Sequence, residues 1–383
     1  MNIALVGCGF VADYYLLTLP NHPQLTVKGV YDINEERTKR FSSYFKVPRY
    51  SSFEELLDDD DVQIVLNLTN PKSHYKVSKS CLEAGKHVYS EKPLAMRLNN
   101  AEVLVELAKE KNLYLSGAPC SVLSESAQTI WKALRQNDIG PVRLVYAELD
   151  DGLIHRMRYR NWISESGTPW PYKDEFEVGC TLEHAGYYVT WLIAFFGPAK
   201  TITSFASCQI KDKETDVKLE VEAPDFSVVC IEFETGIVAR LTCSIIASHD
   251  HTIKFFGDEG TLLMHECWDY GSPVFLQRRT KLALWAEKYP LLTKILRLGP
   301  RKYKAVKNTN YKHKYKGTSR MDFSRGVAEL ADSIEEQREC RLSADFCLHV
   351  NEIVLAIQYP SEMGIPRKIK SSFKKMEPMP WAV

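Results

Sequence analysis

Three side chains of this sequence are suited to proton transfer, namely Lys92, His184 and Tyr188. Lys92 comes shortly after a predicted strand at 87–90. An ammonium beside a bound ligand can orient a hydroxyl and shuttle its proton, especially where desolvation lowers its pKa. His184 and Tyr188 are four residues apart, which places them on one face of a helix. A phenol, with a usual pKa near about 10, needs a nearby cation such as Lys92 to act as a base at neutral pH. We therefore predict a catalytic relay of these three groups, with a slight preference for ketone reduction.

Simpler interpretations stay open for the same residues. Lys92 could be a surface lysine after a strand, and His184 and Tyr188 could be a core histidine and a helix-facing aromatic residue. Glu183 is turned about 100° away from His184 on a helix, so we expect it to be structural. His249 and His251 would point the same way along a strand, but no third ligand is evident, and we predict no metal site.

The N-terminal segment 2–12 has the sequence N-I-A-L-V-G-C-G-F-V-A, which predicts a strand, a tight turn and the start of a helix. In this pattern Gly7 permits the turn, Gly9 leaves room for a pyrophosphate, and Ala12 allows close packing of the helix. The phosphates would then meet the helix N-terminus, where Phe10 and Val11 complete the predicted contacts. The alternative is an ordinary buried first strand.

Asp32 follows a second apolar strand, about 20 residues past the glycines, as expected for an acid that binds the ribose hydroxyls of NAD. This favours NAD over NADP, although Arg37 or Lys39 could accommodate an extra phosphate. Further polar residues follow later strands, at the edge of the sheet where open α/β folds bind ligands. We include them among the predicted cofactor contacts: Thr69, Asn70, His74, Glu91 and Lys92.

Two kinds of strand pattern divide the chain. Over residues 1–120 strands alternate with helical patterns, which predicts a doubly wound parallel sheet, the Rossmann fold, as an NAD-binding domain. Residues 142–150 and 201–248 alternate apolar and polar side chains, which predicts a large, mostly antiparallel open sheet. The predicted fold class is α/β, with a second α+β domain for substrate binding and oligomerisation over residues 121–383.

Several phrases of the sequence resemble one known family. These are the glycine motif, Ala84-Gly85-Lys86-His87-Val88, Glu91-Lys92-Pro93, and segments 256–262 and 322–357. Together they resemble the glucose-fructose oxidoreductase, inositol dehydrogenase and MocA (Gfo/Idh/MocA) family. The resemblance implies an NAD(H)-dependent oxidoreductase that acts on a secondary alcohol or ketone of a sugar, cyclitol or sugar nucleotide. It also implies that Lys92 reaches the substrate, and that the open sheet packs in a homodimer or homotetramer.

The sequence departs from the family pattern at two positions. The family usually has an aspartate and, four residues later, a histidine, whereas alignment on Gly179 and Gly186 gives His184 and Tyr188. Because of this departure, we do not expect the proton to be taken up by a histidine that pairs with an aspartate four residues earlier. Two other functions stay open: an NAD-dependent glycosidase that oxidises its sugar transiently, and a non-enzymatic NAD-binding sensor.

The segment 153–173 is rich in aromatic and arginine side chains, which stack on sugar rings and hold phosphate or carboxylate oxygens. An equally weighted interpretation is a surface loop stapled by the same residues. The predicted substrate-binding residues are Lys92, Arg158, Tyr159, Trp162, Tyr172 and His184.

Composition excludes other classes of protein. The 383 residues hold 49 basic and 49 acidic side chains, a balance unlike that of a nucleic-acid binder, and no apolar run approaches the roughly 18 residues of a membrane span. Ten cysteines without a C-x-x-C pair, and no basic leader, suggest a cytoplasmic protein. Within an expected insertion at 265–320, residues 278–316 hold 13 basic side chains and one acid. This segment could bind a membrane or partner, cover the sheet, or steer a phosphorylated substrate.

Overall fold

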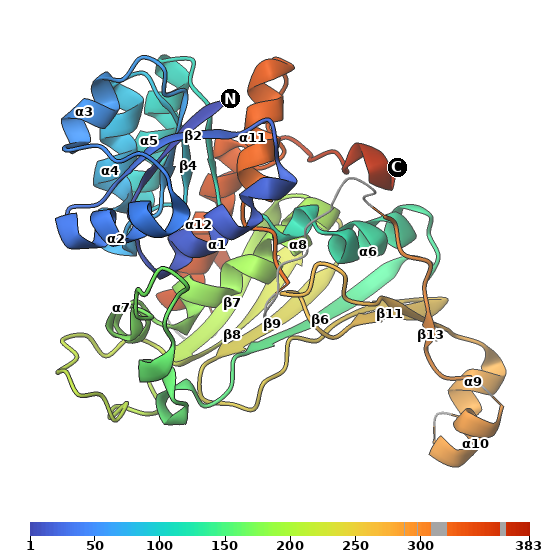
Figure 1. Ribbon diagram of the computed structural model, residues 1–383. Coiled ribbons are helices and arrows are strands. Elements are labelled where there is room, and N and C mark those ends of the chain that lie inside the picture. The colour runs from blue at the N-terminus through green and yellow to red at the C-terminus, as the bar shows by residue number, and fades with distance from the viewer. Residues whose placement is uncertain (287, 297, 308–319, 361–364) are drawn as a thin grey trace.

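The computed structural model describes residues 1–286, 288–296, 298–307, 320–360 and 365–383, which form two sheets with helices around them (Figure 1). The first sheet has the order β2-β1-β3-β4-β5, and all its pairs are parallel, as predicted. Its strands are β1 (Asn2–Val6), β2 (Thr26–Tyr31), β3 (Ile64–Asn67), β4 (His87–Ser90) and β5 (Leu115–Gly117). The helices are α1 (Phe10–Thr18), α2 (Glu35–Phe45), α3 (Phe53–Asp58), α4 (His74–Glu83) and α5 (Leu98–Glu110).

The second sheet has the order β13-β12-β11-β10-β6-β9-β8-β7-β14. Among the described strands its pairs are antiparallel except β6 with β9, which confirms the predicted mostly antiparallel sheet. Its strands are β6 (Val142–Asp150), β7 (Ala199–Ser207), β8 (Phe226–Phe233), β9 (Val238–Ser244), β10 (Ile253–Gly257), β11 (Gly260–Met264), β12 (Phe275–Arg278), β13 (Arg301–Lys302) and β14 (Arg367–Lys368).

Helices cover one face of this second sheet and join it to the first. They are α6 (Glu125–Arg135), α7 (Tyr172–Val178), α8 (Gly186–Phe196) and α12 (Ala344–Gln358). Helix α11 (Arg325–Glu335) instead contacts β4 and β5 of the first sheet. Helix α12 contacts β7 and α8 on one side and α5 of the first domain on the other. A continuous apolar core therefore runs between the two sheets. Residues that follow β3 and β4 contact the second domain, Asn70 through Asp174 and Lys92 through Glu183.

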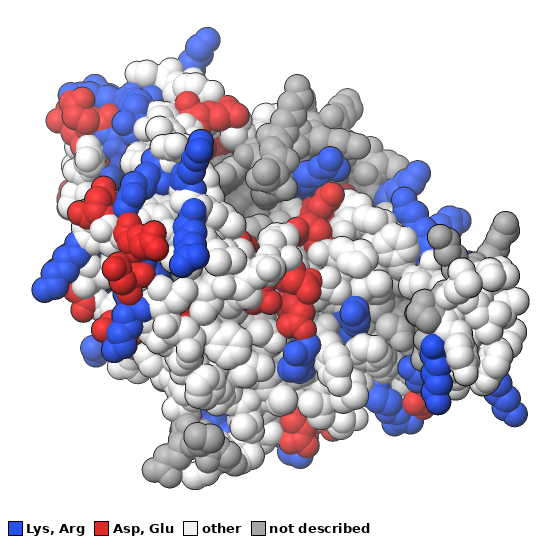
Figure 2. All heavy atoms as spheres, turned by 90° about the horizontal axis from the view of Figure 1, so that it is seen from below, with Lys and Arg blue, Asp and Glu red and all other residues white. Residues whose placement is uncertain are grey.

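Two short helices, α9 (Lys281–Ala286) and α10 (Pro290–Ile295), project from the edge of the second sheet (Figure 1). Apolar side chains on them face solvent: Leu282, Trp285 and Leu291 are 50%, 57% and 73% exposed. In Figure 2 this projection is a mainly uncharged lobe with Lys and Arg at its margin. These two helices do not cover the sheet, so that interpretation is wrong for α9 and α10. Residues 287, 297 and 308–316 of the basic segment lie outside the described residues. No helix in the described ranges is long and apolar enough to cross a membrane.

Candidate active site

Lys92 follows β4 and lies at the junction of the two domains. Its ammonium donates a hydrogen bond to the Glu183 carboxylate, at the other side of that junction. Burial lowers the pKa of Lys92, but Glu183, with smaller contributions from Glu91 and Glu175, outweighs burial and holds the pKa above its usual value. The expectation that desolvation lowers this pKa is therefore wrong. Lys92 keeps its charge and acts as a hydrogen-bond donor.

A π-helix, Thr181–Ala185, runs into α8 and decides which side chains face Lys92. A π-turn holds an extra residue, so faces on either side of it are rotated relative to a continuous α-helix, and such turns are frequent at functional sites. Here the π-turn directs Glu183 to Lys92 and His184 to Asp151. The expectation that Glu183 is structural assumed α-helical spacing, and the contact with Lys92 corrects it.

His184 is buried beside two carboxyl groups. Its Nε2 atom lies 3.1 Å from Asp151 Oδ2 and 3.2 Å from Glu175 Oε1, while Nδ1 is buried without a hydrogen-bond partner in the described chain. Burial and the nearby Lys92 lower the pKa of His184 despite the opposing effect of Asp151. An ionised Asp151 would fix the ring proton on Nε2 and leave the lone pair of Nδ1 free, which is the arrangement of an oriented general base.

The two carboxyl groups beside His184 titrate in opposite directions. Burial raises the pKa of Glu175 well above its usual value, and the neighbouring Glu183 raises it further. Burial also opposes ionisation of Asp151, but His184 and His251 outweigh it and lower the pKa of Asp151. Asp151 is therefore the anion of the pair, and Glu175 is the protonated acid.

The structure does not bring Tyr188 into this group. Its fully buried hydroxyl donates a hydrogen bond to the carbonyl oxygen of His251, and burial raises its pKa well above the usual value. Four-residue spacing from His184 predicted a shared face, but the π-turn removes that register. The assignment of Tyr188 to the proton relay is corrected accordingly. The neighbouring Tyr187 lies within electrostatic reach of Lys92 instead, with a phenol that burial keeps neutral.

The glycine turn leaves the space that a dinucleotide needs. Gly7 has φ +99°, and a Cβ there would lie 2.6 Å from the carbonyl oxygen of Leu68, so only glycine fits. A Cβ on Gly9 would meet nothing within 4 Å, which leaves its surface open at the start of α1, at Phe10, Val11 and Ala12. The residues present thus fit a pyrophosphate at this helix N-terminus.

Asp32 lies at the end of β2, beside this turn. Its Oδ2 atom accepts hydrogen bonds from the Cys8 amide at 2.9 Å and from Arg37 at 3.3 Å. Ile33, the next residue, is 93% exposed and offers an apolar surface to a planar base. This edge therefore fits the adenosine half of a dinucleotide, because the Asp32 carboxylate and the Arg37 guanidinium lie beside the surface that Ile33 offers to the base.

The other predicted cofactor residues brace the surrounding loops. The ring nitrogens of His74 lie 2.7 Å from the Pro93 carbonyl oxygen and 2.8 Å from that of Thr69. Glu91 accepts hydrogen bonds from the Tyr15 hydroxyl at 2.7 Å and from the Lys92 amide at 3.0 Å. The amide of Asn70 donates to Asp174 at 2.7 Å. The contacts with Pro93 and with the Lys92 amide hold the backbone on both sides of the Lys92 side chain in place.

Aromatic side chains of the predicted substrate loop pack on one another. Tyr159 is buried, with ring centroids 5.1 Å from Tyr172 and 6.1 Å from Trp170, and Trp162 lies 4.9 Å from Trp170. This is the stapled loop of the alternative interpretation. Arg158 is exposed. The roles of these four predicted residues in substrate binding stay predictions.

The tip of the same loop reaches the first domain. The backbone amide and hydroxyl of Ser166 donate to the Asp13 carboxylate at 2.6 and 2.7 Å, and Arg40 donates to Thr168 at 2.9 Å. Asp13 belongs to the first turn of α1, so the loop crosses next to the glycine turn. The loop therefore ties the second domain to the dinucleotide-binding edge.

Sequence reasoning missed Asp151, Glu175 and Tyr187. Asp151 directly follows a predicted strand, and its place at a strand end was a usable signal. Glu175 and Tyr187 carried none, because their positions depend on the packing of α7 and on the π-turn.

Comparison with known proteins gives the family. Residues 1–118 match the model described as "Oxidoreductase family, NAD-binding Rossmann fold", and residues 127–263 match the Gfo/Idh/MocA C-terminal domain. The chain belongs to the Gfo/Idh/MocA oxidoreductase family. It is similar to trans-1,2-dihydrobenzene-1,2-diol dehydrogenase of Mus musculus, with 26% identity over 69% of this chain and 74% of that protein.

Solved structures share the whole fold of this family member. The aldose-aldose oxidoreductase of Caulobacter crescentus has a TM-score of 0.74 and 18% identity, and the match covers 96% of this chain and 99% of that one. KijD10, a 3-ketoreductase of Actinomadura kijaniata in complex with NADP, has a TM-score of 0.70 and 18% identity, and the match covers 93% and 96% of the two chains. The family model and the dehydrogenase relatives identify the protein as an NAD(P)-dependent oxidoreductase.

Proposed function

We propose that this protein transfers a hydride reversibly between a nicotinamide dinucleotide and a secondary alcohol or ketone of a sugar, cyclitol or sugar nucleotide. The observation that carries the proposal is the buried Nδ1 atom of His184, which has no hydrogen-bond partner in the described part of the chain. The Nε2 atom of the same ring lies beside the Asp151 carboxylate, in a site that also holds Lys92. The bound nicotinamide would supply the hydride chemistry, and the protein would supply orientation and proton transfer.

In alcohol oxidation, two side chains act on the substrate hydroxyl. The Lys92 ammonium, directed by Glu183, donates a hydrogen bond to the hydroxyl oxygen. The hydroxyl proton passes to Nδ1 of His184, and the Asp151 carboxylate stabilises the imidazolium that forms. The lowered pKa of His184 keeps its ring neutral before the reaction, as a base must be.

Ketone reduction uses the same groups in the opposite direction. The His184 imidazolium returns its proton to the carbonyl oxygen while Lys92 donates a hydrogen bond to it. The neutral Tyr187 phenol, close to Lys92, is a second donor for that oxygen. We therefore assign the tyrosine role of the relay to Tyr187, with Lys92 and His184 in their predicted roles.

We propose NAD as the preferred cofactor, with NADP less favoured. Asp32 would accept hydrogen bonds from the ribose hydroxyls and repel a 2′-phosphate. Arg37 forms an ion pair with Asp32. If NADP bound, the Arg37 guanidinium would pair with its 2′-phosphate. For assembly we propose a homodimer or homotetramer through the open face of the second sheet, where Leu144, Tyr146 and Phe205 are exposed.

One observation supports a second candidate, an NAD-dependent glycosidase. Burial keeps Glu175 protonated beside His184, and a neutral carboxyl group could donate a proton to the oxygen of a leaving sugar. Such an enzyme would oxidise and re-reduce its substrate in each cycle. It would consume a glycoside without net formation of NADH.

The test incubates the purified protein with NAD or NADP and a panel of sugars, inositols, sugar nucleotides and aryl glycosides. Nicotinamide absorbance and sugar release are followed together, and each hit is repeated with His184→Ala, Lys92→Met and the control Lys76→Met, an exposed position on α4. Net NADH formation that is lost in the first two variants only would support the dehydrogenase. NAD-dependent cleavage without net NADH would support the glycosidase, and tight NAD binding without turnover would support a sensor.

A further inference from the structure

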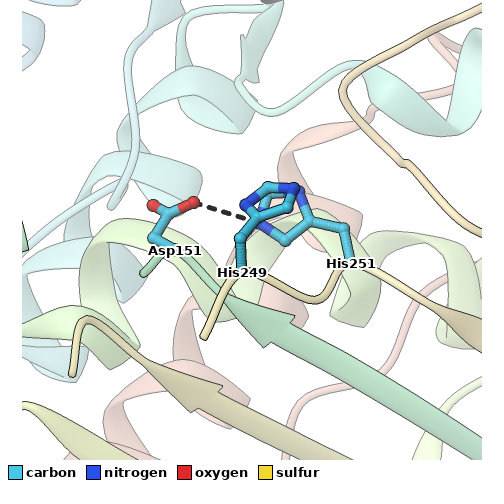
Figure 3. A group of neighbouring side chains, drawn as sticks. All are labelled: Asp151, His249 and His251. Atoms are coloured by element: carbon cyan, nitrogen blue, oxygen red, sulfur yellow. Dashed lines mark hydrogen bonds and ion pairs between the residues drawn. The ribbon is translucent and has the colours of Figure 1, made fainter. Parts of the chain in front are cut away.

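A second cluster of side chains lies at Oδ1 of Asp151, the oxygen that faces His251, whereas Oδ2 faces His184. His249 and His251, in the loop between β9 and β10, meet Asp151 from the end of β6 (Figure 3). One ligand atom from each of the three residues lies within 4.8 Å of the other two. The third ligand that is not evident in the sequence is thus supplied by a strand more than ninety positions earlier in the chain.

The spacing within the cluster is close to that of a metal site. Asp151 Oδ1 and His251 Nε2 are 3.0 Å apart. Two ligands about 2.0–2.1 Å from a tetrahedral zinc ion are separated by about 3.3 Å, so a change of a few tenths of an ångström would admit the ion. The His249 and His251 rings are adjacent, with centroids 4.2 Å apart, and a His249 nitrogen lies within 4.8 Å of the other two ligand atoms. The Nε2 atom of His249 also lies 3.1 Å from Glu266 Oε2.

Outer contacts orient these ligands. Glu266 Oε1 lies 2.7 Å from His251 Nδ1, so Nε2 is the nitrogen presented to Asp151. The other oxygen of Asp151, Oδ2, faces His184 and leaves Oδ1 for the cluster. A carboxylate behind a ligating histidine is the usual second-sphere partner in metal sites, where it fixes the ring and strengthens the ligand.

Burial and charge also suit a divalent cation. The side chain of His251 has no exposed surface, whereas that of His249 is 54% exposed. An ion could therefore reach the site from solvent on the His249 side. Two carboxylates, Asp151 and Glu266, converge on the cluster. A divalent ion would offset their two negative charges.

We propose that Asp151, His249 and His251 bind a divalent transition metal, with zinc as the best match, and leave its fourth position to water. Imidazole nitrogens with a carboxylate oxygen are typical zinc ligands, whereas magnesium and calcium prefer oxygen alone. This site shares Asp151 with the proposed hydride transfer, through its other carboxylate oxygen, and metal binding is measured separately from hydride transfer.

The test titrates chelator-treated protein with ZnCl₂ by calorimetry at pH 7.5, and with CoCl₂ by visible absorption. We expect one ion per chain and the absorption bands of tetrahedral cobalt. His249→Ala removes an exposed ligand without loss of the fold, and we expect zinc affinity to fall at least about 10-fold. His265→Ala, an exposed histidine after β11, is the matched control and should bind as the parent does.

Two outcomes would overturn the proposal. One is the lack of stoichiometric uptake of either metal by protein with an intact thermal transition. The other is binding that His249→Ala and His265→Ala weaken equally, because that result places the ion elsewhere. As a second variant, Glu266→Gln keeps all three ligands, and we expect it to weaken zinc binding less than His249→Ala does.

Discussion

Asp151 Oδ2 lies 3.1 Å from Nε2 of His184, and Nδ1 of the same ring has no partner among the described residues. The family pattern usually has an aspartate before a histidine on one helix, and this chain lacks that arrangement. Here the aspartate comes from the end of β6 and the histidine from a π-turn. The chain thus rebuilds an aspartate-backed histidine from two distant segments.

Asp151→Asn tests this pair. An amide can donate to Nε2 of His184, which would move the ring proton to Nδ1 and abolish the base. We expect kcat to fall about 100-fold or more, with little change in the dissociation constant of NAD. The control is Asp150→Asn, whose carboxylate accepts a hydrogen bond from Ser244 at the neighbouring position. Equal kcat values in the two variants would exclude the assigned role of Asp151.

Glu183→Gln tests why Lys92 stays charged. Glu183 raises the pKa of Lys92 against burial, which lowers it. Loss of the carboxylate leaves burial dominant, so we expect the pKa to fall. The measurement is the pH dependence of kcat, where the variant should lose activity at a lower alkaline pH than the parent. Identical alkaline limbs in the pH profiles of the variant and the parent would contradict the claim that Glu183 raises the pKa of Lys92.

Tyr187→Phe and Tyr188→Phe should separate catalysis from stability. Loss of the Tyr187 hydroxyl removes a donor near Lys92, so we expect kcat to fall with little change in the melting temperature. Loss of the Tyr188 hydroxyl leaves the His251 carbonyl unpaired, so we expect about 1–3 kcal/mol less stability. The measurements are the kcat and the melting temperature of both variants. A larger loss of kcat in Tyr188→Phe than in Tyr187→Phe would assign the proton relay to Tyr188 after all.

Asp32→Ser tests cofactor choice. Without the carboxylate, Arg37 is released from its ion pair and can meet a 2′-phosphate. We expect the ratio of NADP to NAD affinities to rise at least about 10-fold, the equivalent of about 1.4 kcal/mol. Fluorescence titration with both reduced cofactors measures this ratio. Asp32→Ser combined with Arg37→Ala should lose the gain for NADP, and a gain that persists would assign the phosphate to another cation.

The cofactor edge could be predicted from sequence because its determinants are local. Gly7 and Gly9 act through the backbone of a single turn, and Asp32 ends the strand paired with β1. Parallel pairing places such strand ends side by side whatever the loops do. The position of Lys92 could be predicted from the sequence for the same reason, since it follows the end of β4 by two residues.

The rest of the site depends on packing that periodicity does not reveal. Helical spacing paired His184 with Tyr188, but the π-turn changes the register, and Tyr188 enters the core instead. Asp151 and Glu175 meet His184 only when β6, α7 and α8 are packed together. The aromatic loop shows the same limit, because its residue types fit sugar stacking and mutual packing equally well.

Acid stability gives a last prediction, through His349 on α12. Burial lowers the pKa of His349 from its usual 6.5 to about 4 and outweighs the Ser371 carbonyl group and Glu352, which raise it. One ring nitrogen accepts from the Ala199 amide at 2.9 Å, and the other lies 3.0 Å from the Ser371 carbonyl oxygen. The unfolded chain binds a proton here near pH 6.5 and the folded chain only near pH 4, so stability falls as the pH is lowered between these values. The full loss is about 3 kcal/mol. Urea unfolding from pH 7 to pH 4 should show a smaller loss for His349→Gln than for the parent and for the exposed control His265→Gln, and equal slopes would assign the acid sensitivity to other groups.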